Sequence, residues 1–160
     1  TVIATARGAD KLAVAKTHGA DHLIDYAAED LRARVKEIAG DKGVNVIYDP
    51  VGGDVFDTSL RCLAWEGRLV VVGFAAGRIP QAPANLLLVK NMAVMGVFWG
   101  AYRQRDPRVL RDSFAELLSW YAAGKLKPHI SHRFALDQAP QAMAAMLERR
   151  STGKVILKTR

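Results

Sequence analysis

Cysteine is nearly absent from this sequence, since Cys62 is the only one among 160 residues. The chain therefore has no internal disulfide and no cluster of thiolates for a metal ion. Long apolar runs are also missing, because the longest, Leu69 to Ala76, is far short of the roughly 20 residues that span a bilayer. Residues 1–20 do not show the basic start and apolar stretch of a secretory signal. We expect a cytoplasmic protein that does not span a membrane.

Clustered charge is missing too. The chain carries 23 Lys and Arg against 16 Asp and Glu, a net charge of +7. No five like charges follow one another, and no stripe of Lys and Arg is interleaved with aromatic side chains, as a nucleic-acid surface would require. We expect a solvated basic face, and a nucleic-acid-binding module without catalysis stays as an alternative.

The composition that is present is that of a globular domain. Apolar residues make up 50% of the chain and charged residues 24%. A single domain of this length buries roughly 70% of the surface of its unfolded chain. A hydrophobic core is therefore expected.

Apolar strands alternate with amphipathic helices through the first half. Strands are expected at residues 2–6, 22–26, 44–49 and 67–73, and helices at residues 10–18, 28–40 and 54–64. Short strands separated by helices of this length form right-handed βαβ units and a parallel sheet. The sequence therefore predicts an α/β fold with a Rossmann-like, doubly wound parallel sheet.

The second half continues with longer elements. We expect a short helix followed by an edge strand from Met92 to Trp99, and then an amphipathic helix from Arg105 to Leu126. Asp106 suits the N-cap of that helix, and Pro107 suits its first position. An extended stretch, a helix at residues 137–150 and a last strand at residues 152–160 complete the chain.

Small or special residues follow the expected strands at their carboxyl ends, which is where open parallel sheets bind ligands. The four stretches are "TARG", "DY", "DPVGG" and "GFAAG". Any single glycine among them fits an ordinary tight turn. Such residues after four consecutive strands favour a flat ligand that approaches the backbone closely.

The turn after the first expected strand bears on the choice of cofactor. After the second strand of a dinucleotide-binding fold an acidic residue binds the ribose of NAD, whereas a basic residue there accommodates the 2′-phosphate of NADP. Arg7 and Lys11 flank this turn. Asp10 is the counter-argument, although it also suits a helix N-cap. We therefore favour NADPH over NADH.

Five segments agree in order and spacing with one known family: "GADHLIDY", "KGVNVIYDPVGGDVFDTSLRCLAWEGRLVVVGFAAG", "NMAVMGVFWG", "GKLKPHISHRFAL" and "STGKVILKTR". On these segments the whole chain resembles the downstream part of the zinc-independent (zeta-crystallin-like) quinone oxidoreductases, in the medium-chain dehydrogenase/reductase superfamily. The resemblance implies that residues 1–126 form most of a Rossmann cofactor-binding domain and residues 127–160 a segment of the catalytic domain. It places the family's first strand, glycine-rich phosphate loop and first helix ahead of Thr1.

The resemblance also implies a set of cofactor contacts. Arg7 and Lys11 match positions near the 2′-phosphate, and Tyr26 matches a tyrosine on the adenosine phosphate side. Pro50 and Val51 match a strand end that passes the adenine ribose and the nicotinamide, although a serine is common where Pro50 stands. The other matches are the strand and loop beside the nicotinamide (Val72, Gly73, Phe74, Ala75), the segment that closes on it (Phe98, Trp99) and two cations that reach the phosphates (Arg150, Lys154).

The chemistry that this resemblance implies is hydride transfer from NADPH to a quinone or another conjugated carbonyl. The cofactor carries the hydride, so we expect no catalytic side chain and no metal ligand, and we interpret Asp49 and Asp57 as structural. A homodimer through the strand Met92–Trp99 is also implied. An enoyl-thioester or acrylyl-type reductase of the same superfamily stays open. A glycine-rich loop anchors the pyrophosphate in such folds, and the resemblance places this loop ahead of Thr1. We therefore expect the 160-residue chain alone to bind NADPH weakly and to show no quinone reductase activity.

Overall fold

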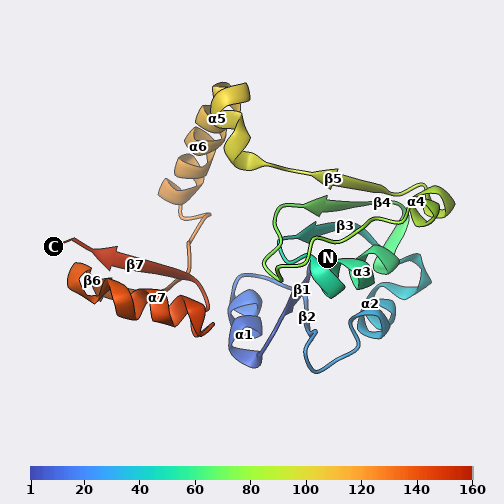
Figure 1. Cartoon of the computed structure of the whole chain (residues 1–160), viewed down its shortest axis with the longest axis horizontal. Helices are drawn as coiled ribbons and strands as arrows, with labels where there is room; N and C mark the ends of the chain where they lie inside the picture. Colours follow the sequence, from blue (N-terminus) through green and yellow to red (C-terminus); the bar gives the residue numbers. More distant parts are fainter. Residues whose placement is uncertain (160) are drawn as a thin grey trace. The chain divides into compact units, whose positions relative to one another are not determined.

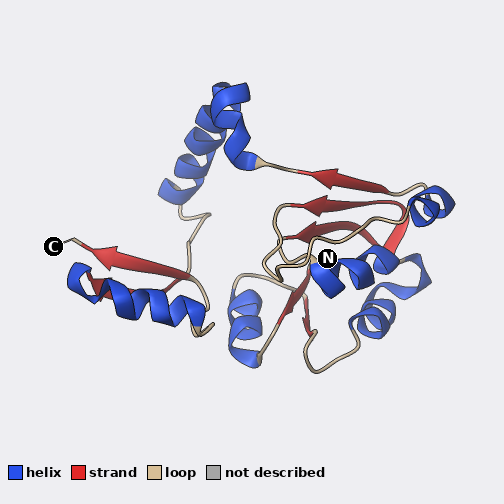
Figure 2. Ribbon diagram, in the orientation of Figure 1, coloured by secondary structure: helices blue, strands red, loops and turns tan. Residues whose placement is uncertain are grey.

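The computed structural model describes residues 1–159 of the chain (Figures 1 and 2). Helices alternate with strands, and every ladder between the described strands is parallel. The predicted α/β class with parallel sheets is thereby confirmed. The chain divides into two compact units, Thr1–Tyr102 and a second that begins at Arg103.

The first unit holds two parallel sheets and the helices that connect their strands. β1 (Ile3–Ala6) pairs with β2 (His22–Asp25), while β3 (Val44–Asp49), β4 (Leu63–Val71) and β5 (Ala93–Gly96) form a three-stranded sheet in that order. The connecting helices are α1 (Ala9–Thr17), α2 (Leu31–Ala39), α3 (Gly53–Cys62) and α4 (Ala84–Lys90), with short 3-10 turns η1 (Gly40–Lys42) and η2 (Trp99–Ala101).

Helix α2 shows how local sequence sets these boundaries. The carboxylate of Asp30 accepts a hydrogen bond from the backbone N–H of Ala33 at 2.9 Å, which caps the first turn. Gly40 ends the helix with a φ of 68°, a conformation that glycine adopts without steric cost. Between these ends, Leu31 and Val35 lie four residues apart and are both buried.

Helices α3 and α4 cover one face of the three-stranded sheet. Phe56 and Leu60 of α3 pack with Leu69 of β4 in a buried cluster, and Leu86 and Leu87 of α4 pack against it. A second cluster contains Ile24, Leu31, Val35 and Cys62, and it takes in apolar side chains from β1 and from β3. These two clusters fix the strand ends that carry the predicted site.

The second unit has fewer helices and strands among the described residues. Its elements are α6 (Pro107–Ala122), β6 (Ile130–Ala135), the 3-10 turn η3 (Leu136–Gln138), α7 (Ala139–Leu147) and β7 (Lys154–Lys158), while the short α5 (Tyr102–Arg105) starts at the boundary. β6 and β7 pair in parallel, and α7 buries Ala142 and Ala145.

Three predicted elements differ by several residues in the structure. The strand expected at residues 67–73 runs from Leu63 to Val71, because α3 already ends at Cys62. The strand expected from Met92 to Trp99 is wrong in length, because β5 ends at Gly96 and Trp99 begins η2. Its neighbour β4 ends at Val71, the residue opposite Gly96, so the residues that follow lie past the end of the ladder.

The long helix expected from Arg105 to Leu126 is interrupted at Asp106 and ends at Ala122. Asp106 is the N-cap of α6, where its carboxylate accepts from the N–H of Arg108 at 3.2 Å, and Pro107 follows as expected. In the part of the chain that the structure describes, no helix is long and apolar enough to cross a membrane. The predicted division into residues 1–126 and 127–160 separates a cofactor-binding domain from a catalytic domain. The compact units are defined by packing, so this division stays a prediction.

Candidate functional site

Two loops are joined by main-chain hydrogen bonds at the carboxyl ends of β3 and β4. The N–H groups of the second loop donate to carbonyls of the first: Val72 to Asp49 (2.9 Å), Ala75 to Pro50 (3.1 Å) and Ala76 to Val51 (2.9 Å). The structure therefore brings the predicted residues Pro50 and Val51 together with the predicted segment Val72–Ala75.

The buried carboxylate of Asp49 sets the path of the first loop. Its Oδ1 accepts from the N–H groups of Val51 at 2.8 Å and Gly52 at 3.0 Å, which turns the chain from β3 into α3. Gly52 has a φ of 69°, in the left-handed region that favours glycine. Asp49 is 3% exposed, and within residues 1–159 its other oxygen, Oδ2, is buried and has no hydrogen-bond partner.

Glycine lets the two loops approach closely. A Cβ atom at Gly73 would lie 3.3 Å from the carbonyl oxygen of Pro50. One at Gly52 would lie 3.1 Å from Cδ1 of Phe74 and 3.3 Å from the carbonyl oxygen of Arg78. The absence of a side chain at Gly52 and Gly73 therefore lets the two loops lie in close contact at the strand ends.

Arg78 ties the second loop to α3, and sequence reasoning missed it. Its Nη2 lies 2.5 Å from Oδ2 of Asp57 and 2.9 Å from Oδ1 of Asp54. These carboxylates, Asp57 before Asp54, raise the pKa of Arg78. Residues three apart share a helix face, so the pair of aspartates in the first turns of α3 was the available signal. Asp57 thus forms an ion pair with Arg78, and its interpretation as a structural residue stays a prediction.

The ends of β1 and β2 bring a second group of predicted residues together. The N–H of Gly8 donates to Oδ2 of Asp25 at 3.1 Å, and the N–H of Tyr26 donates to the carbonyl of Ala6 at 3.3 Å. Arg7 and Tyr26 therefore follow neighbouring strand ends. Tyr26 is half-buried and packs against the cluster around Ile24.

Lys11 lies in the first turn of α1, next to the same strand end. Among the described residues, neither Arg7 nor Lys11 forms a salt bridge, so both charges are available to an anion. Asp10 is not the N-cap, because α1 begins at Ala9 and Gly8 takes the cap position. The carboxylate of Asp10 sits instead in the first turn, where the helix dipole favours it.

The two predicted aromatic residues follow β5. The N–H of Val97 donates to the carbonyl of Val71 at 2.9 Å, which continues the link between β4 and β5. The ring of Trp99 meets that of Tyr102 edge to face, with centroids 5.8 Å apart. Phe98 is exposed and makes no such ring contact among residues 1–159.

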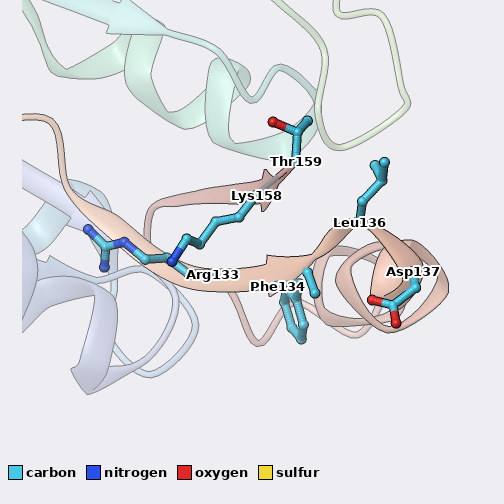
Figure 3. Close-up of a pocket in the computed structure, with 7 residues that line it drawn as sticks. Arg133, Phe134, Leu136, Asp137, Lys158 and Thr159 are labelled. Atoms are coloured by element: carbon cyan, nitrogen blue, oxygen red, sulfur yellow. The ribbon is translucent and has the colours of Figure 1, made fainter.

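Arg150 and Lys154 belong to the second unit. Nε of Arg150 lies 2.7 Å from Oε2 of Glu148, and the N–H of Lys154 donates to the carbonyl of His129 at 2.9 Å. A surface hollow in this unit is lined by Arg133 and Lys158, whose side chains extend the same way in Figure 3. Neither Arg150 nor Lys154 lines that hollow.

Comparison with known proteins assigns the chain to one family. A family model described as "Zinc-binding dehydrogenase" matches residues 18–157. The chain belongs to this family. It is 47% identical over 152 residues to "Quinone oxidoreductase-like protein 2 homolog" of Nematostella vectensis and 34% identical over 157 residues to "Quinone oxidoreductase" of Pseudomonas aeruginosa. The resemblance to the quinone oxidoreductases is therefore confirmed.

A solved structure agrees with these relatives in fold. The Escherichia coli quinone oxidoreductase complexed with NADPH superposes with a TM-score of 0.85 at 32% identity, over 97% of this dehydrogenase-family chain and 48% of that chain. The match to the Nematostella relative covers 94% of this chain and 42% of the relative, and the match to the Pseudomonas relative covers 98% and 48%. The chain thus spans less than half the length of the relatives it matches.

The name of the family mentions zinc, and the described residues do not fit a zinc site. Structural zinc is held by four ligands from Cys, His, Asp or Glu, and catalytic zinc by three and a water. Residues 1–159 contain no group of three or more such side chains placed to hold a metal ion.

Proposed function

We propose that the protein of which this chain is part is an NADPH-dependent oxidoreductase of the quinone reductase type, which transfers a hydride to a quinone or another conjugated carbonyl. The observation that carries the proposal is the pair of hydrogen-bonded loops, residues 49–53 and 72–78, at the carboxyl ends of β3 and β4. The names of the relatives, quinone oxidoreductases and their like, support the reaction class. Zinc-independence and a cytoplasmic location belong to the same proposal and rest on the family resemblance.

The described residues suit a nicotinamide dinucleotide in two places. When bound, the nicotinamide would supply the hydride that the acceptor takes up. Pro50, Val51 and the segment Val72–Ala75 would hold that end by main-chain contacts, and Phe98 and Trp99 would close on it. Tyr26 would lie on the adenosine phosphate side, while Arg150 and Lys154 would face the phosphates. No catalytic side chain is proposed.

Arg7 and Lys11 carry the proposed preference for NADPH over NADH. Both cations lie beside the end of β1 without an ion pair among the described residues, so a 2′-phosphate would neutralise them. We expect the double variant Arg7→Gln, Lys11→Gln to lose its preference for NADPH in an NMR titration of both cofactors at millimolar concentration. Lys16→Gln, on the same helix, is the matched control. Retained preference in the double variant would remove these residues from the site.

For the 160-residue chain alone we propose weak NADPH binding and no quinone reductase activity. α3 starts on Gly52 and Gly53, but none of the described helices starts on the G-x-G-x-x-G pattern that anchors the pyrophosphate in such folds. Titration of NADPH fluorescence tests the binding, and micromolar affinity would overturn this part of the proposal. Assay with a soluble quinone tests the activity.

A homodimer through the edge strand that follows α4 is proposed on a separate observation. β5 is an edge of its sheet among the described strands, and Val97 and Phe98 beyond it are exposed. Exposed apolar edges are normally covered. Light scattering of the chain should report two copies, and Val97→Lys should return it to one. A monomeric wild-type chain at high concentration would end this proposal.

Two alternative functions are distinguished from the proposed one by experiment. An enoyl-thioester or acrylyl-type reductase would share the cofactor contacts and differ in the acceptor, so an acceptor screen of the whole protein separates it from a quinone reductase. A nucleic-acid-binding module would show a salt-dependent shift with RNA and no response to NADPH.

A further inference from the structure

Positive charge is concentrated in one of the two compact units. Of the 23 Lys and Arg, 11 lie in residues 1–102 and 12 in residues 103–160. Of the 16 Asp and Glu, 11 lie in the first unit and 5 in the second, so the whole net charge of +7 belongs to the second unit. A field of one sign raises the local concentration of small ions of the opposite sign. The second unit therefore attracts anions.

The surface hollow of this unit lies at the carboxyl ends of its two parallel strands (Figure 3). It is lined by the end of β6, by Leu136 and Asp137 of η3, and by Lys158 and Thr159 at the end of β7. Open parallel sheets bind ligands beyond the carboxyl ends of their strands. The hollow has a volume of about 810 Å³, and small-molecule sites have roughly 300–1,000 Å³. Its place and size therefore suit a small molecule.

Two cations of the hollow lie on the same face of the ladder between β6 and β7. Arg133 is in register with Ile156 and Ala135 with Lys158, and residues two apart on a strand share a face. Both side chains are exposed, and they extend the same way in Figure 3. Neither forms a salt bridge among residues 1–159. Like charges on one face repel each other, and an anion between them would remove this repulsion.

The lining of the hollow indicates the class of anion. A phosphate monoester carries about −1.5 to −2 charges at pH 7, which matches two cations, and its oxygens accept several hydrogen bonds. The guanidinium of Arg133, the ammonium of Lys158 and the hydroxyl of Thr159 are all donors. Leu136 lines the same hollow and is 57% exposed, so it offers an apolar surface. Together these groups suit a phosphate that is attached to an apolar body.

Asp137 is the acidic residue among those that line the hollow. In Figure 3 its carboxylate lies at the opposite end of the hollow from the guanidinium of Arg133. It forms no salt bridge with either cation among the described residues. Its charge therefore leaves both cations available and weakens the binding of an anion from a distance.

We propose that this hollow binds a small phosphate monoester. The phosphate group lies between Arg133 and Lys158 and accepts from the hydroxyl of Thr159, and the apolar body of the ligand contacts Leu136. The site is separate from the cations proposed for NADPH, because Lys154 lies at the other end of β7, roughly 13 Å along the strand from Lys158. This inference does not rest on the proposed hydride transfer.

The test is a titration of the isotope-labelled chain with phenyl phosphate, followed by two-dimensional NMR. We expect saturable shifts of the amide signals of residues 133–137 and 158–159. Inorganic phosphate should shift the same signals with about threefold lower affinity, because it lacks the apolar body. Benzoate, which carries a single charge, should also bind more weakly than phenyl phosphate. Shifts spread over the second unit without saturation would mean general attraction by its net charge, and they would overturn the proposal.

Removal of each cation tests its place in the site. Arg133→Gln and Lys158→Gln should each lower the affinity for phenyl phosphate about threefold, and the double variant about tenfold. Both side chains are exposed, so the thermal melt of the chain should not change. Lys125→Gln removes one exposed positive charge of the same unit outside the hollow and should leave the affinity unchanged. An equal loss in Lys125→Gln would show that net charge, and not this hollow, attracts the phosphate.

Asp137→Asn tests the site with the opposite sign. Removing this carboxylate should raise the affinity for phenyl phosphate about twofold, whereas Glu116→Gln, at an exposed position of α6, should not change it. Equal affinity of Asp137→Asn and wild type would place the phosphate outside this hollow. The double variant Arg7→Gln, Lys11→Gln should bind phenyl phosphate like wild type. A loss there would assign the phosphate to the proposed cofactor site instead.

Discussion

The two compact units differ in where their apolar side chains lie. All but two of the buried apolar residues that the structure describes belong to Thr1–Tyr102, and the exceptions, Ala142 and Ala145, are small. In the second unit, α6 has the spacing of an amphipathic helix, yet Phe114, Leu118 and Tyr121 are exposed. Amphipathic spacing thus indicates that a helix has an apolar face. Whether that face is buried depends on whether other elements of the fold pack against it.

The largest expected effect is on the stability of the core of the first unit. Leu60→Ala, in the cluster beneath the three-stranded sheet, should lower the free energy of unfolding by about 2–5 kcal/mol, since Leu60 is 1% exposed. Leu118→Ala makes the same chemical change on α6, where the side chain is 64% exposed, and should stay within about 0.5 kcal/mol. Urea denaturation followed by circular dichroism measures both. Equal losses would mean that α6 is buried in solution.

The next largest effect is expected from replacing one glycine in each unit by alanine. Gly43 has a φ of 77°, and a Cβ atom there would lie 2.4 Å from the carbonyl oxygen of Cys62. Gly124, after α6, has a φ of 69° with no atom within 4 Å of such a Cβ. Gly124→Ala should cost only the strain of the left-handed conformation, roughly 1–2 kcal/mol, and Gly43→Ala should cost more because main chain must shift. Thermal melts of the two variants compare them directly.

The thiol of Cys62 reports on the opening of the first unit. Burial raises the pKa of Cys62, so less thiolate is present at a given pH than for an exposed cysteine. We expect slow reaction with a disulfide reagent at pH 8, and faster reaction in Leu60→Ala. Ser119→Cys in a Cys62→Ala background places the same group on α6 and should react at once. Similar rates for the two thiols would contradict the difference in packing.

The smallest effect concerns the start of α6. The ion pair with Arg108 holds the pKa of Asp106 below its ordinary value. A carboxyl whose folded pKa is lowered stabilises the fold above its unfolded pKa, and this contribution is lost as the pH falls through the lowered value. Helical circular dichroism should therefore decrease in acid. Asp106→Asn keeps a capping oxygen and does not titrate, so the part of the change due to Asp106 should disappear.

Local sequence predicted the features that a few neighbouring residues determine. Asp106 and Pro107 start α6, Gly40 stops α2, and alternating elements gave the parallel ladders. The length of β5 was not predictable in this way, because it depends on where its neighbour β4 ends. Apolar residues after Gly96 continue the strand pattern in sequence, but they extend past that ladder.

The candidate site also combines features that local sequence predicted with a long-range contact that it did not. Small residues after successive strands pointed to the loops at Pro50 and Gly73, which the structure joins. The contact between Arg78 and Asp57 was missed, since it links residues 21 apart, with the end of α3, the strand β4 and a loop between them. NADPH binding by the predicted residues stays a prediction, which the NMR and fluorescence titrations test.

The hydrogen bonds between residues 49–51 and 72–76 run from main chain to main chain. Their geometry does not depend on which side chains Val51, Phe74 or Ala75 carry. Substitutions at these three positions are therefore expected to leave the course of both loops unchanged. Sequence can vary at the carboxyl ends of β3 and β4 at little cost to the fold.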